Sequence, residues 1–362
     1  MADAELRRRV LWALRCPVCA RDLELRGDLL TCRDGHGFAH LQAVRTRNGS
    51  DLADLRDAKT ARPLLLKIPK LAHWNAWSEE RLDHLIRHEA ATAAGLRAAL
   101  GPGPYGVPDM LPGPVPGRAL LMPRLEGPSL ERRLYGREAW VRPRRVLDGC
   151  RRSGAWLAAM VAATAGERTR FDPEQTLERT RGFLAEVGER GHPEHKVRWL
   201  AAMVEAGAGH AAGTDVVRCL VHGDFRPRHV VLTGEGATVI DWEDATEDWA
   251  HQDAAFYLAS LDGFLAQHPR RRWSPAARLA GRAFLAAYLR DAPPGWADAG
   301  PLFRVAAMVR ALNIDYRGRL ARRRPAVFRR VVLPHYDRWF RAWQRAEQRG
   351  YPTFAGPRIG RM

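Results

Sequence analysis

The sequence predicts an α+β protein in which a short cysteine-bearing segment and a small strand-rich region precede a mostly helical region. The chain has 362 residues and is 46% hydrophobic, which is enough for two or three folding units with packed cores. Strand-like apolar runs gather before residue 126, and the later part is helical in pattern apart from one strand-rich stretch, Val216 to Asp241. We therefore expect a ribbon over residues 1–45, a small lobe with a hinge over 46–125, and a helical lobe over 126–362.

The composition is strongly basic, and it contains no membrane-span pattern. Fifty-eight Lys and Arg against 41 Asp and Glu give a net charge of +17. Such a charge favours polyanions, including nucleotide and RNA, but the arginine-rich usage of a GC-rich genome explains it equally well. The longest apolar runs, such as Ala155 to Ala163, fall far short of the roughly 20 residues of a membrane span. Met1 to Arg9 is charged and no apolar signal core follows it, so we expect a cytoplasmic protein.

Four residues near the N-terminus have the spacing of a metal site. Cys16, Cys19, Cys32 and His36 form a C-x2-C-x12-C-x3-H array. Two ligand pairs on tight turns suit a tetrahedral Zn²⁺ ion, and the leucine-rich segment between the pairs fits a hairpin that holds them together. So small a unit needs metal to fold, and with four positions filled the zinc would be structural. His40 is the alternative fourth ligand.

The segment CPVCARDLELRGDLLTCRDGHGF, residues 16–38, resembles the N-terminal zinc ribbon of the ribosomal RNA guanine-N1 methyltransferases. The resemblance covers no methyltransferase domain. It implies at most a docking module for nucleic acid or protein, because zinc ribbons are reused in many unrelated proteins.

A second group of candidate residues surrounds the strand-rich stretch in the later half of the chain. The β-type run Val216 to Val221 leads into the loop HGDFRPRH, and an apolar hairpin with a Thr-Gly-Glu-Gly turn follows. Antiparallel pairing would place His229, before the first hairpin strand, beside Asp241, after the second. Asp224 lies on the adjoining loop. Two carboxylates that converge repel each other unless a cation lies between them, and Mg²⁺ prefers such oxygen ligands. The pattern therefore predicts a metal–nucleotide site.

The phrases HGDFRPRH and VIDWEDA together resemble the catalytic loop and the metal-binding aspartate of the aminoglycoside phosphotransferase and choline kinase-like family. The resemblance covers about residues 60–345 and implies a bilobal, protein-kinase-like fold, with ATP and Mg²⁺ as cofactors and an alcohol group of a small molecule or glycolipid as acceptor. It implies that Asp224 accepts the proton of the substrate hydroxyl and that Asp241 holds Mg²⁺. His222 and Arg226 complete the expected catalytic set, His222 by shaping the loop.

Lys67 interrupts an apolar, buried-looking strand at the place where such kinases carry the lysine that binds the α- and β-phosphates. The helix expected over Glu79 to Leu100 carries Glu89 on its apolar stripe. A carboxylate on a core-facing surface is unfavourable unless it is paired, so we expect an ion pair between Lys67 and Glu89. Glu79 and Glu80 are the alternative partners, although carboxylates in a first turn stabilise the helix dipole.

Three further residues complete the expected nucleotide site. The run LLMPRL, residues 120–125, resembles the hinge that contacts adenine through its backbone, which makes Met122 and Leu125 candidates. No G-x-G-x-x-G motif is present, and Gly49 lies in the best candidate for a turn that covers phosphates.

Asp253, in HQDAAFYLASL, matches an aspartate that braces the catalytic loop in the family.

His229 is the second candidate ligand of Mg²⁺. The sequence departs from the family here, because most members have an asparagine that supplies the second metal contact. A neutral imidazole ligates Mg²⁺ poorly. A histidine at this position is also a point of resemblance to the lipopolysaccharide core and Kdo-type sugar kinases. The alternative function is a nucleic-acid-binding zinc-ribbon protein with a degenerate nucleotide-binding domain. Retention of Lys67, Glu89, Asp224 and Asp241 favours the phosphotransferase.

Overall fold

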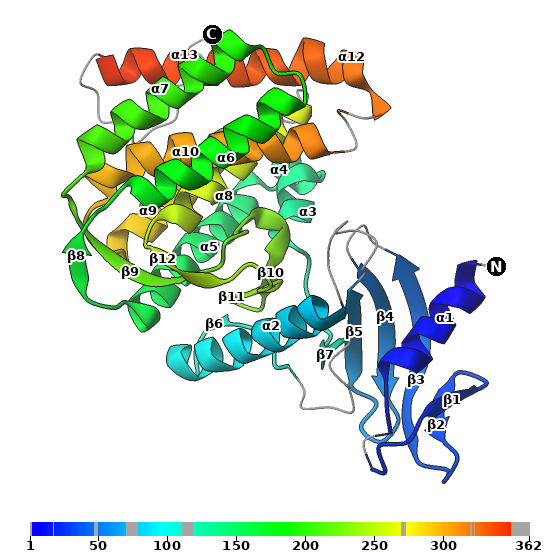
Figure 1. Ribbon diagram of the computed structural model, residues 1–362. Helices are drawn as coiled ribbons and strands as arrows, with labels where there is room; N and C mark the ends of the chain where they lie inside the picture. The colour runs from blue at the N-terminus through cyan, green and yellow to red at the C-terminus, as the bar shows by residue number, and fades with distance from the viewer. Residues whose placement is uncertain are drawn as a thin grey trace. The chain divides into compact units, whose positions relative to one another are not determined.

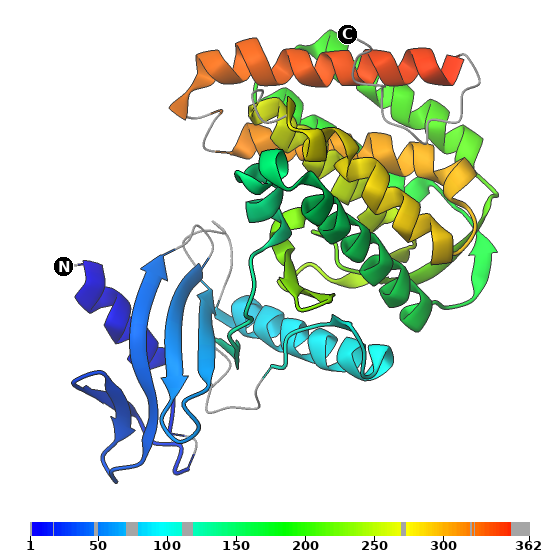
Figure 2. The same cartoon turned by 180° about the vertical axis from the view of Figure 1, so that it is seen from behind.

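The computed structural model describes residues 2–16, 18–46, 50–69, 79–110, 119–268, 273–318, 321 and 323–348 (Figures 1 and 2). The chain divides into two compact units. The first comprises Met1–Gly101, Gly106–Gly127 and Thr238–Asp244, and the second comprises Pro102–Tyr105, Pro128–Ala237 and Ala245–Met362. The predicted α+β class, with antiparallel strands in the N-terminal region and helices in the C-terminal region, is confirmed.

The first unit is built on one six-stranded antiparallel sheet in the order β1-β2-β3-β4-β5-β7 (Figure 1). Its strands are β1 (Leu23–Arg26), β2 (Leu29–Cys32), β3 (Gly37–Thr46), β4 (Ser50–Asp57), β5 (Pro63–Pro69) and β7 (Leu120–Pro123). Because β3 continues past residue 45, the segment expected to form a separate ribbon shares this sheet with the strands that follow it. Strands β3 and β4, which precede and follow the candidate turn at Gly49 in the sequence, form an antiparallel pair.

The two faces of the sheet carry different helices. Helix α1 (Ala2–Ala13), which the sequence analysis did not anticipate, packs on one face against β1, β3 and β5. Helix α2 (Glu79–Leu100) has the predicted bounds, and its apolar stripe is buried at helical spacing. The buried stripe residues are Leu82, Ile86, Ala93 and Leu96.

Strand β5 shows how the sequence assigns side chains to these faces. Its exposure alternates with period two, so Leu64, Leu66 and Ile68 join the large apolar cluster that also contains residues of α1. Leu65 lies on the opposite face and packs with the cluster that contains Leu82 and other residues of α2. Lys67, two residues after Leu65, is on that same face.

The second unit is mainly helical, with α5 packed along α9 and α10 packed against α6, α7 and α8 (Figure 2). Its longer helices are α5 (Pro143–Thr164), α6 (Glu174–Glu189), α7 (Glu194–Ala211), α8 (Gln252–Gln267), α9 (Pro275–Asp291), α10 (Trp296–Arg317) and α13 (Leu333–Gln348). The shorter ones are α3 (Leu130–Tyr135), α4 (Glu138–Val141), α12 (Pro325–Val327), the 3₁₀ turn η2 (Pro227–His229) and the π-helical turn η4 (Phe328–Val332).

Two small sheets hold the loop that the sequence analysis singled out. One has the order β12-β9-β8, and the other has the order β10-β11-β6. The strands are β6 (Tyr105–Gly106), β8 (Arg168–Arg170), β9 (Asp215–Val221), β10 (Val230–Thr233), β11 (Gly236–Val239) and β12 (Thr246–Trp249). The predicted order of a strand, a loop and a hairpin is therefore present as β9, the 222–229 loop, β10 and β11.

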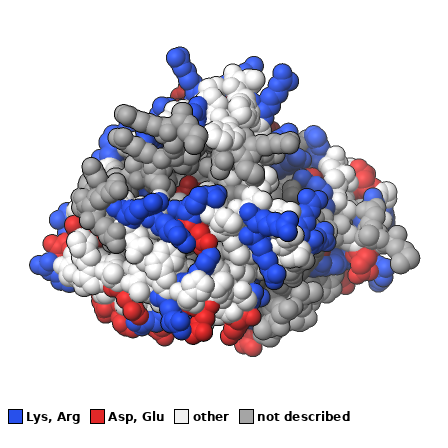
Figure 3. Space-filling model, turned by 90° about the horizontal axis from the view of Figure 1, so that it is seen from above, with Lys and Arg blue, Asp and Glu red and all other residues white. Residues whose placement is uncertain are grey.

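In the view of Figure 3, Lys and Arg side chains form several separate groups, and acidic side chains lie mainly toward the lower edge of the face. Among the described residues on that face, no single basic patch supports the expected contact with RNA or another polyanion. None of the described helices combines the length and the apolar character that crossing a bilayer requires.

The contact between α5 and α9 generates a stability prediction. A Cβ atom on Gly154 would lie 2.2 Å from the Phe284 carbonyl oxygen and 3.0 Å from the Tyr288 nitrogen. Backbone atoms cannot move aside cheaply, so we expect Gly154→Ala to lower the free energy of unfolding by about 2–3 kcal/mol. Chemical denaturation followed by far-UV circular dichroism measures the change.

Gly182 provides the matched control, because it lies within α6 and a Cβ atom there would have no atom within 4 Å. Alanine is the better helix former, so Gly182→Ala should raise the free energy of unfolding by about 0.5–1 kcal/mol. Equal stability of the Gly154→Ala protein and the wild type would contradict the close packing of α5 on α9.

Candidate active site

In the first unit, Lys67 and Glu89 form the ion pair that the sequence predicts. The Lys67 Nζ atom lies 3.0 Å from Glu89 Oε2 and 3.2 Å from Oε1, so the ammonium group is shared by both carboxylate oxygens. Strand β5 supplies the lysine and the buried stripe of α2 supplies the glutamate. Glu80, one of the alternative partners, is exposed to solvent. The role of the pair in cofactor binding stays a prediction.

Two more carboxylates share the same ammonium group. Lys67 Nζ donates to Asp241 Oδ1, and Glu243 Oε2 lies 3.7 Å from it. Burial favours the neutral form of Lys67, but the three surrounding carboxylates overcome this effect and raise its pKa well above the ordinary value. The lysine is therefore a fixed positive charge at any pH near neutrality.

The charge of this group fits a divalent cation. Oxygen atoms of Glu89, Asp241 and Glu243 all lie within 4.8 Å of one another. With Lys67 protonated and all three carboxylates ionised, the four side chains carry a net charge of −2. Burial, together with the charges of Asp241 and Glu89, outweighs the effect of Lys67 and raises the pKa of Glu243 to about 7. An all-oxygen donor set with excess negative charge is one that Mg²⁺ prefers.

The backbone around Asp241 is strained in a way that is typical of functional sites. Asp241 has a φ of 75°, in the left-handed region that side chains other than glycine rarely adopt. Such a conformation costs on the order of 1–3 kcal/mol. Donation from the Trp242 backbone amide to Glu89 Oε1 (3.3 Å) ties the segment to α2. The fold thus maintains an unfavourable backbone conformation where the Asp241 carboxylate reaches Lys67.

In the second unit, the Asp224 carboxylate is held by two arginines of its own loop. Arg226 Nε donates to Oδ1 at 2.8 Å and Arg226 also donates to this oxygen through a terminal nitrogen, while Arg228 donates to Oδ2 at 3.1 Å. Burial raises the pKa of Asp224, but the neighbouring basic side chains, above all the guanidinium of Arg226, outweigh burial and place that pKa below its ordinary value. The carboxylate is therefore ionised and oriented.

The loop that carries Asp224 is braced from two helices. Asp253 of α8 accepts hydrogen bonds from the backbone amides of His222 (2.6 Å) and Gly223 (3.0 Å), which is the bracing role that the sequence predicts. Arg310 of α10 donates to the Gly223 carbonyl oxygen. His222 is fully buried, and its Nδ1 accepts from the Asp224 amide at 3.3 Å, so its contacts shape the loop. A chemical role for His222 stays a prediction.

His229 is buried, and both of its ring nitrogens have protein partners. Arg228 Nε lies 2.7 Å from Nε2, and because a guanidinium only donates, Nε2 must be the acceptor. The proton is therefore on Nδ1, which donates to the Asp224 carbonyl oxygen at 2.9 Å. A metal ligand would need the Nε2 lone pair that Arg228 occupies. Ligation of Mg²⁺ by His229 stays a prediction, and it requires Arg228 to move away.

The four predicted zinc ligands come together in the first unit. One ligand atom from each of Cys16, Cys19, Cys32 and His36 lies within 4.8 Å of the others. His40, the alternative fourth ligand, instead lies 3.2 Å from Asp28 in an ion-pair contact. The spacing in the sequence therefore predicted which histidine joins the cysteines.

The remaining residues predicted to contact the cofactor are Gly49, Met122 and Leu125. Gly49 lies outside the described residues. Met122 is buried in β7 and pairs in register with Leu65, and Leu125 is half-buried just after that strand. Contact of this segment with adenine stays a prediction.

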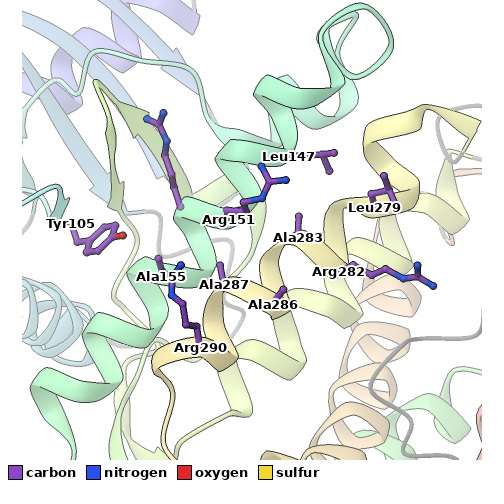
Figure 4. Close-up of a pocket in the computed structure, with 11 residues that line it drawn as sticks. Tyr105, Leu147, Arg151, Ala155, Leu279, Arg282, Ala283, Ala286, Ala287 and Arg290 are labelled. Atoms are coloured by element: carbon purple, nitrogen blue, oxygen red, sulfur yellow. The ribbon is translucent and has the colours of Figure 1, made fainter.

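A groove of about 530 Å³ lies between α5 and α9 in the second unit (Figure 4). Alanine side chains of both helices line it together with Tyr105 and several arginines, among them Arg151, Arg282 and Arg290. The groove shares no lining residue with the Asp224 loop or with the predicted cofactor residues.

Sequence reasoning missed three residues that contribute to these groups. Glu243 lies only two positions after Asp241 in the phrase VIDWEDA, so its proximity to Lys67 could have been inferred once Asp241 was assigned. Arg228 could have been recognised from its four-residue spacing to Asp224. Arg310 donates to a loop 87 residues earlier in the chain, and no local pattern identifies it.

Comparison with known proteins identifies the family and the fold. Residues 46–302 match the family model described as the phosphotransferase enzyme family. No curated protein sequence matches the chain.

Among solved structures, the chain is similar to a glucosamine kinase, with 17% identity, 86% of this chain and 95% of that chain covered, and a TM-score of 0.51. For a glucosamine kinase in complex with glucosamine, ADP and inorganic phosphate, the identity is 16% and the TM-score is 0.50, with 86% of this chain and 96% of that chain covered. For a macrolide 2′-phosphotransferase from Brachybacterium faecium, the identity is 17% and the TM-score is 0.47, with 90% of this chain and 94% of that chain covered. The likeness to the glucosamine kinases shows the fold, and the predicted kinase-like architecture is confirmed.

The brace on the Asp224 loop generates a prediction. In Asp253→Asn, the amide NH₂ group would replace one acceptor oxygen and would face a backbone amide that also donates. We expect the free energy of unfolding to fall by about 1–3 kcal/mol, and amide hydrogen exchange in the 222–229 loop to become faster. Chemical denaturation and hydrogen-exchange mass spectrometry measure the two effects.

Asp291→Asn is the matched control, because Asp291 is exposed and its ion pair is with the exposed Arg290. That substitution should change stability by less than about 0.5 kcal/mol. If Asp253→Asn left both the stability and the loop exchange at wild-type values, the bracing role would be wrong.

Proposed function

The chain belongs to the phosphotransferase enzyme family, and we propose that it transfers the γ-phosphoryl group of ATP to a hydroxyl group of a small molecule or glycolipid, with Asp224 as proton acceptor. The observation that carries this proposal is the buried Lys67 with its three carboxylates. Removing Lys67 and Glu89 from water, with Asp241 and Glu243 partly covered beside them, is unfavourable. A protein that served only as a scaffold would gain nothing from retaining these charges. Their position within the region that matches the family supports a catalytic reason for retaining them.

In this proposal, Lys67 binds oxygens of the α- and β-phosphates. Its raised pKa keeps it protonated, and Glu89 fixes the direction of its ammonium group from α2. Because Glu89 is nearly fully buried, the lysine cannot move far without leaving a buried carboxylate unpaired. The ion pair thus orients the phosphate-binding charge before nucleotide arrives.

Asp241 is the proposed ligand of Mg²⁺, with Glu243 as the nearest additional carboxylate. The excess of negative charge on the group, which reaches −2 when all three carboxylates are ionised, supports this assignment. When bound, the ion would neutralise negative charge on the β- and γ-phosphates. Asp241 would then contact the ion and give up part of its contact with Lys67. The strained backbone at Asp241 supports a functional role for this residue.

Asp224 is proposed to orient the acceptor hydroxyl and to take its proton. Its lowered pKa makes it a weak base, which suffices where the transition state is loose and the proton leaves late. One guanidinium must release a carboxylate oxygen for the hydroxyl to bind. The released group would remain close to the transferring phosphoryl group, which is the role that we propose for Arg226.

A second candidate function is nucleotide binding without turnover, in a zinc-ribbon protein with a degenerate kinase domain. The state of the loop favours it, because both Asp224 oxygens accept from arginines and His229 has its metal-binding lone pair occupied by Arg228. The two candidates differ in whether ATP is consumed in the presence of an acceptor.

The central prediction concerns Asp224→Asn. Because asparagine cannot accept a proton but preserves the shape of the side chain, phosphoryl transfer should fall by about 10²–10⁴-fold, the usual contribution of a general base. Affinity for ADP should stay within twofold of the wild type. A coupled assay of ADP formation across amino sugar, aminoglycoside and choline-type acceptors, with calorimetry of ADP binding, measures both quantities.

Asp291→Asn again serves as the control and should retain wild-type rates. Full activity of the Asp224→Asn protein would refute the assigned base. A wild-type protein that binds ADP and Mg²⁺ but consumes no ATP with any acceptor would favour the second candidate.

A further inference from the structure

We propose that Cys16, Cys19, Cys32 and His36 bind one zinc ion, and that this ion stabilises the β-sheet that carries Lys67 rather than a separate module. The ion would be a structural part of the first unit. The inference rests on the geometry of the four side chains and on the way their strands join the sheet.

The distances between the ligand atoms match a tetrahedral site. Zinc lies about 2.3 Å from thiolate sulfur and about 2.0 Å from imidazole nitrogen, so tetrahedral ligand atoms should be about 3.5–3.8 Å apart. The Sγ atoms of Cys19 and Cys32 are 3.6 Å apart, and His36 Nδ1 lies 3.4 Å from Cys32 Sγ and 3.9 Å from Cys16 Sγ. These separations leave a space at the centre of the four atoms that suits a zinc ion.

The backbone around the cysteines forms two tight turns that aim the side chains inward. In the first turn, the Val18 amide donates to Cys16 Sγ at 3.4 Å, and Ala20 has a φ of 58°. In the second turn, Gly35 has a φ of 80° and its amide donates to the Cys32 carbonyl oxygen at 2.9 Å. An amide that donates to sulfur stabilises the thiolate form, which is the form that binds metal.

All four tetrahedral positions are supplied by protein side chains. A catalytic zinc ion keeps a position open for water or substrate, and a structural one does not. The proposed ion would therefore take no part in phosphoryl transfer. Its contribution would be to the stability of the strands that hold its ligands.

These strands lead directly to Lys67. The ligand Cys32 ends β2, and hydrogen bonds then connect β2 to β3, β3 to β4 and β4 to β5. Cys16 and Cys32 also belong to the same buried apolar cluster as Leu66 and Ile68, the two neighbours of Lys67 in β5. Loosening of the turns would expose this shared core.

Helix α1, which immediately precedes Cys16, provides a second connection. Arg9 of α1 forms an ion pair with Asp51 of β4, whose side chain is buried. Arg9 also donates to the carbonyl oxygen of Pro69, at the end of β5, at 3.3 Å. The segment that begins the metal cluster is thus tied at its other end to the last residue of the strand that carries Lys67.

The first test is metal content. The full chain, purified without added chelator from cells grown with zinc, should contain one zinc per chain by mass spectrometry of the metal. His36→Ala should contain less than one fifth of that amount, whereas His40→Ala, a nearby histidine that contacts Asp28, should retain it. Cobalt-exchanged wild type should show the absorption bands of a tetrahedral cobalt thiolate site, which tests the ligand set even if His36→Ala fails to fold.

The second test is hydrogen exchange in the wild-type chain before and after zinc removal with a strong chelator. Amides of β5 (Pro63–Pro69) should exchange at least tenfold faster after removal, and those of α5, in the second unit, should be unchanged. Restoring zinc should restore protection. Neither test uses nucleotide or acceptor, so this inference and the proposed function can fail independently.

A wild-type chain without stoichiometric zinc, or an octahedral cobalt spectrum, would overturn the metal site. Bound zinc whose removal leaves β5 exchange unchanged would overturn the structural coupling.

Discussion

The buried ammonium group of Lys67 is the constraint on which the first unit depends. It comes from β5, and its partners come from α2 and from the segment that follows β11, so three separate parts of the chain must meet at one charge. Each of these groups alone would be unfavourable in the interior, and breaking such a group by removing one partner typically costs about 3–5 kcal/mol. Because these charges need one another, they restrict the position of α2 on the sheet to fewer arrangements than its apolar stripe alone would allow.

The elements around this charge could be predicted because their signals are local. The bounds of α2 follow from a stripe with helical period, and Glu89 was identified because a carboxylate on that stripe requires a partner. Strand β5 was recognised from an apolar run with one lysine, and the expected ion pair with Glu89 then placed Lys67 toward α2. The hairpin of β10 and β11 was marked by its glycine-containing turn, and the zinc ligands by their spacing. In each case, one short continuous stretch of the chain contains the whole pattern.

The parts that the sequence did not reveal depend on pairing between distant segments. The candidate turn at Gly49 favours pairing of β3 with β4, but no local feature states that β3 also pairs with β2. This second pairing makes the metal-ligand strands part of the sheet that carries Lys67. Arg310 reaches Gly223 from α10, and that contact exists only once α10 has packed against α8. The protonation of the His229 ring is another property that the sequence did not reveal. Its identity suggested a metal ligand, but the donor Arg228 decides which nitrogen carries the proton, and therefore what the ring can do.

The two faces of β5 explain how the proposed metal site, which has no open position, could still matter to Lys67, the proposed nucleotide-binding residue. Leu66 and Ile68 belong to the apolar core that also contains Cys16 and Cys32, while Lys67, between them, points to the opposite face. A strand cannot hold one face in register and release the other, because a shift of one residue exchanges the two faces completely. The same packing that would close around a zinc ion therefore keeps Lys67 facing Glu89. With no glycine-rich phosphate motif in the sequence, the precision of the proposed nucleotide site would depend heavily on this one strand.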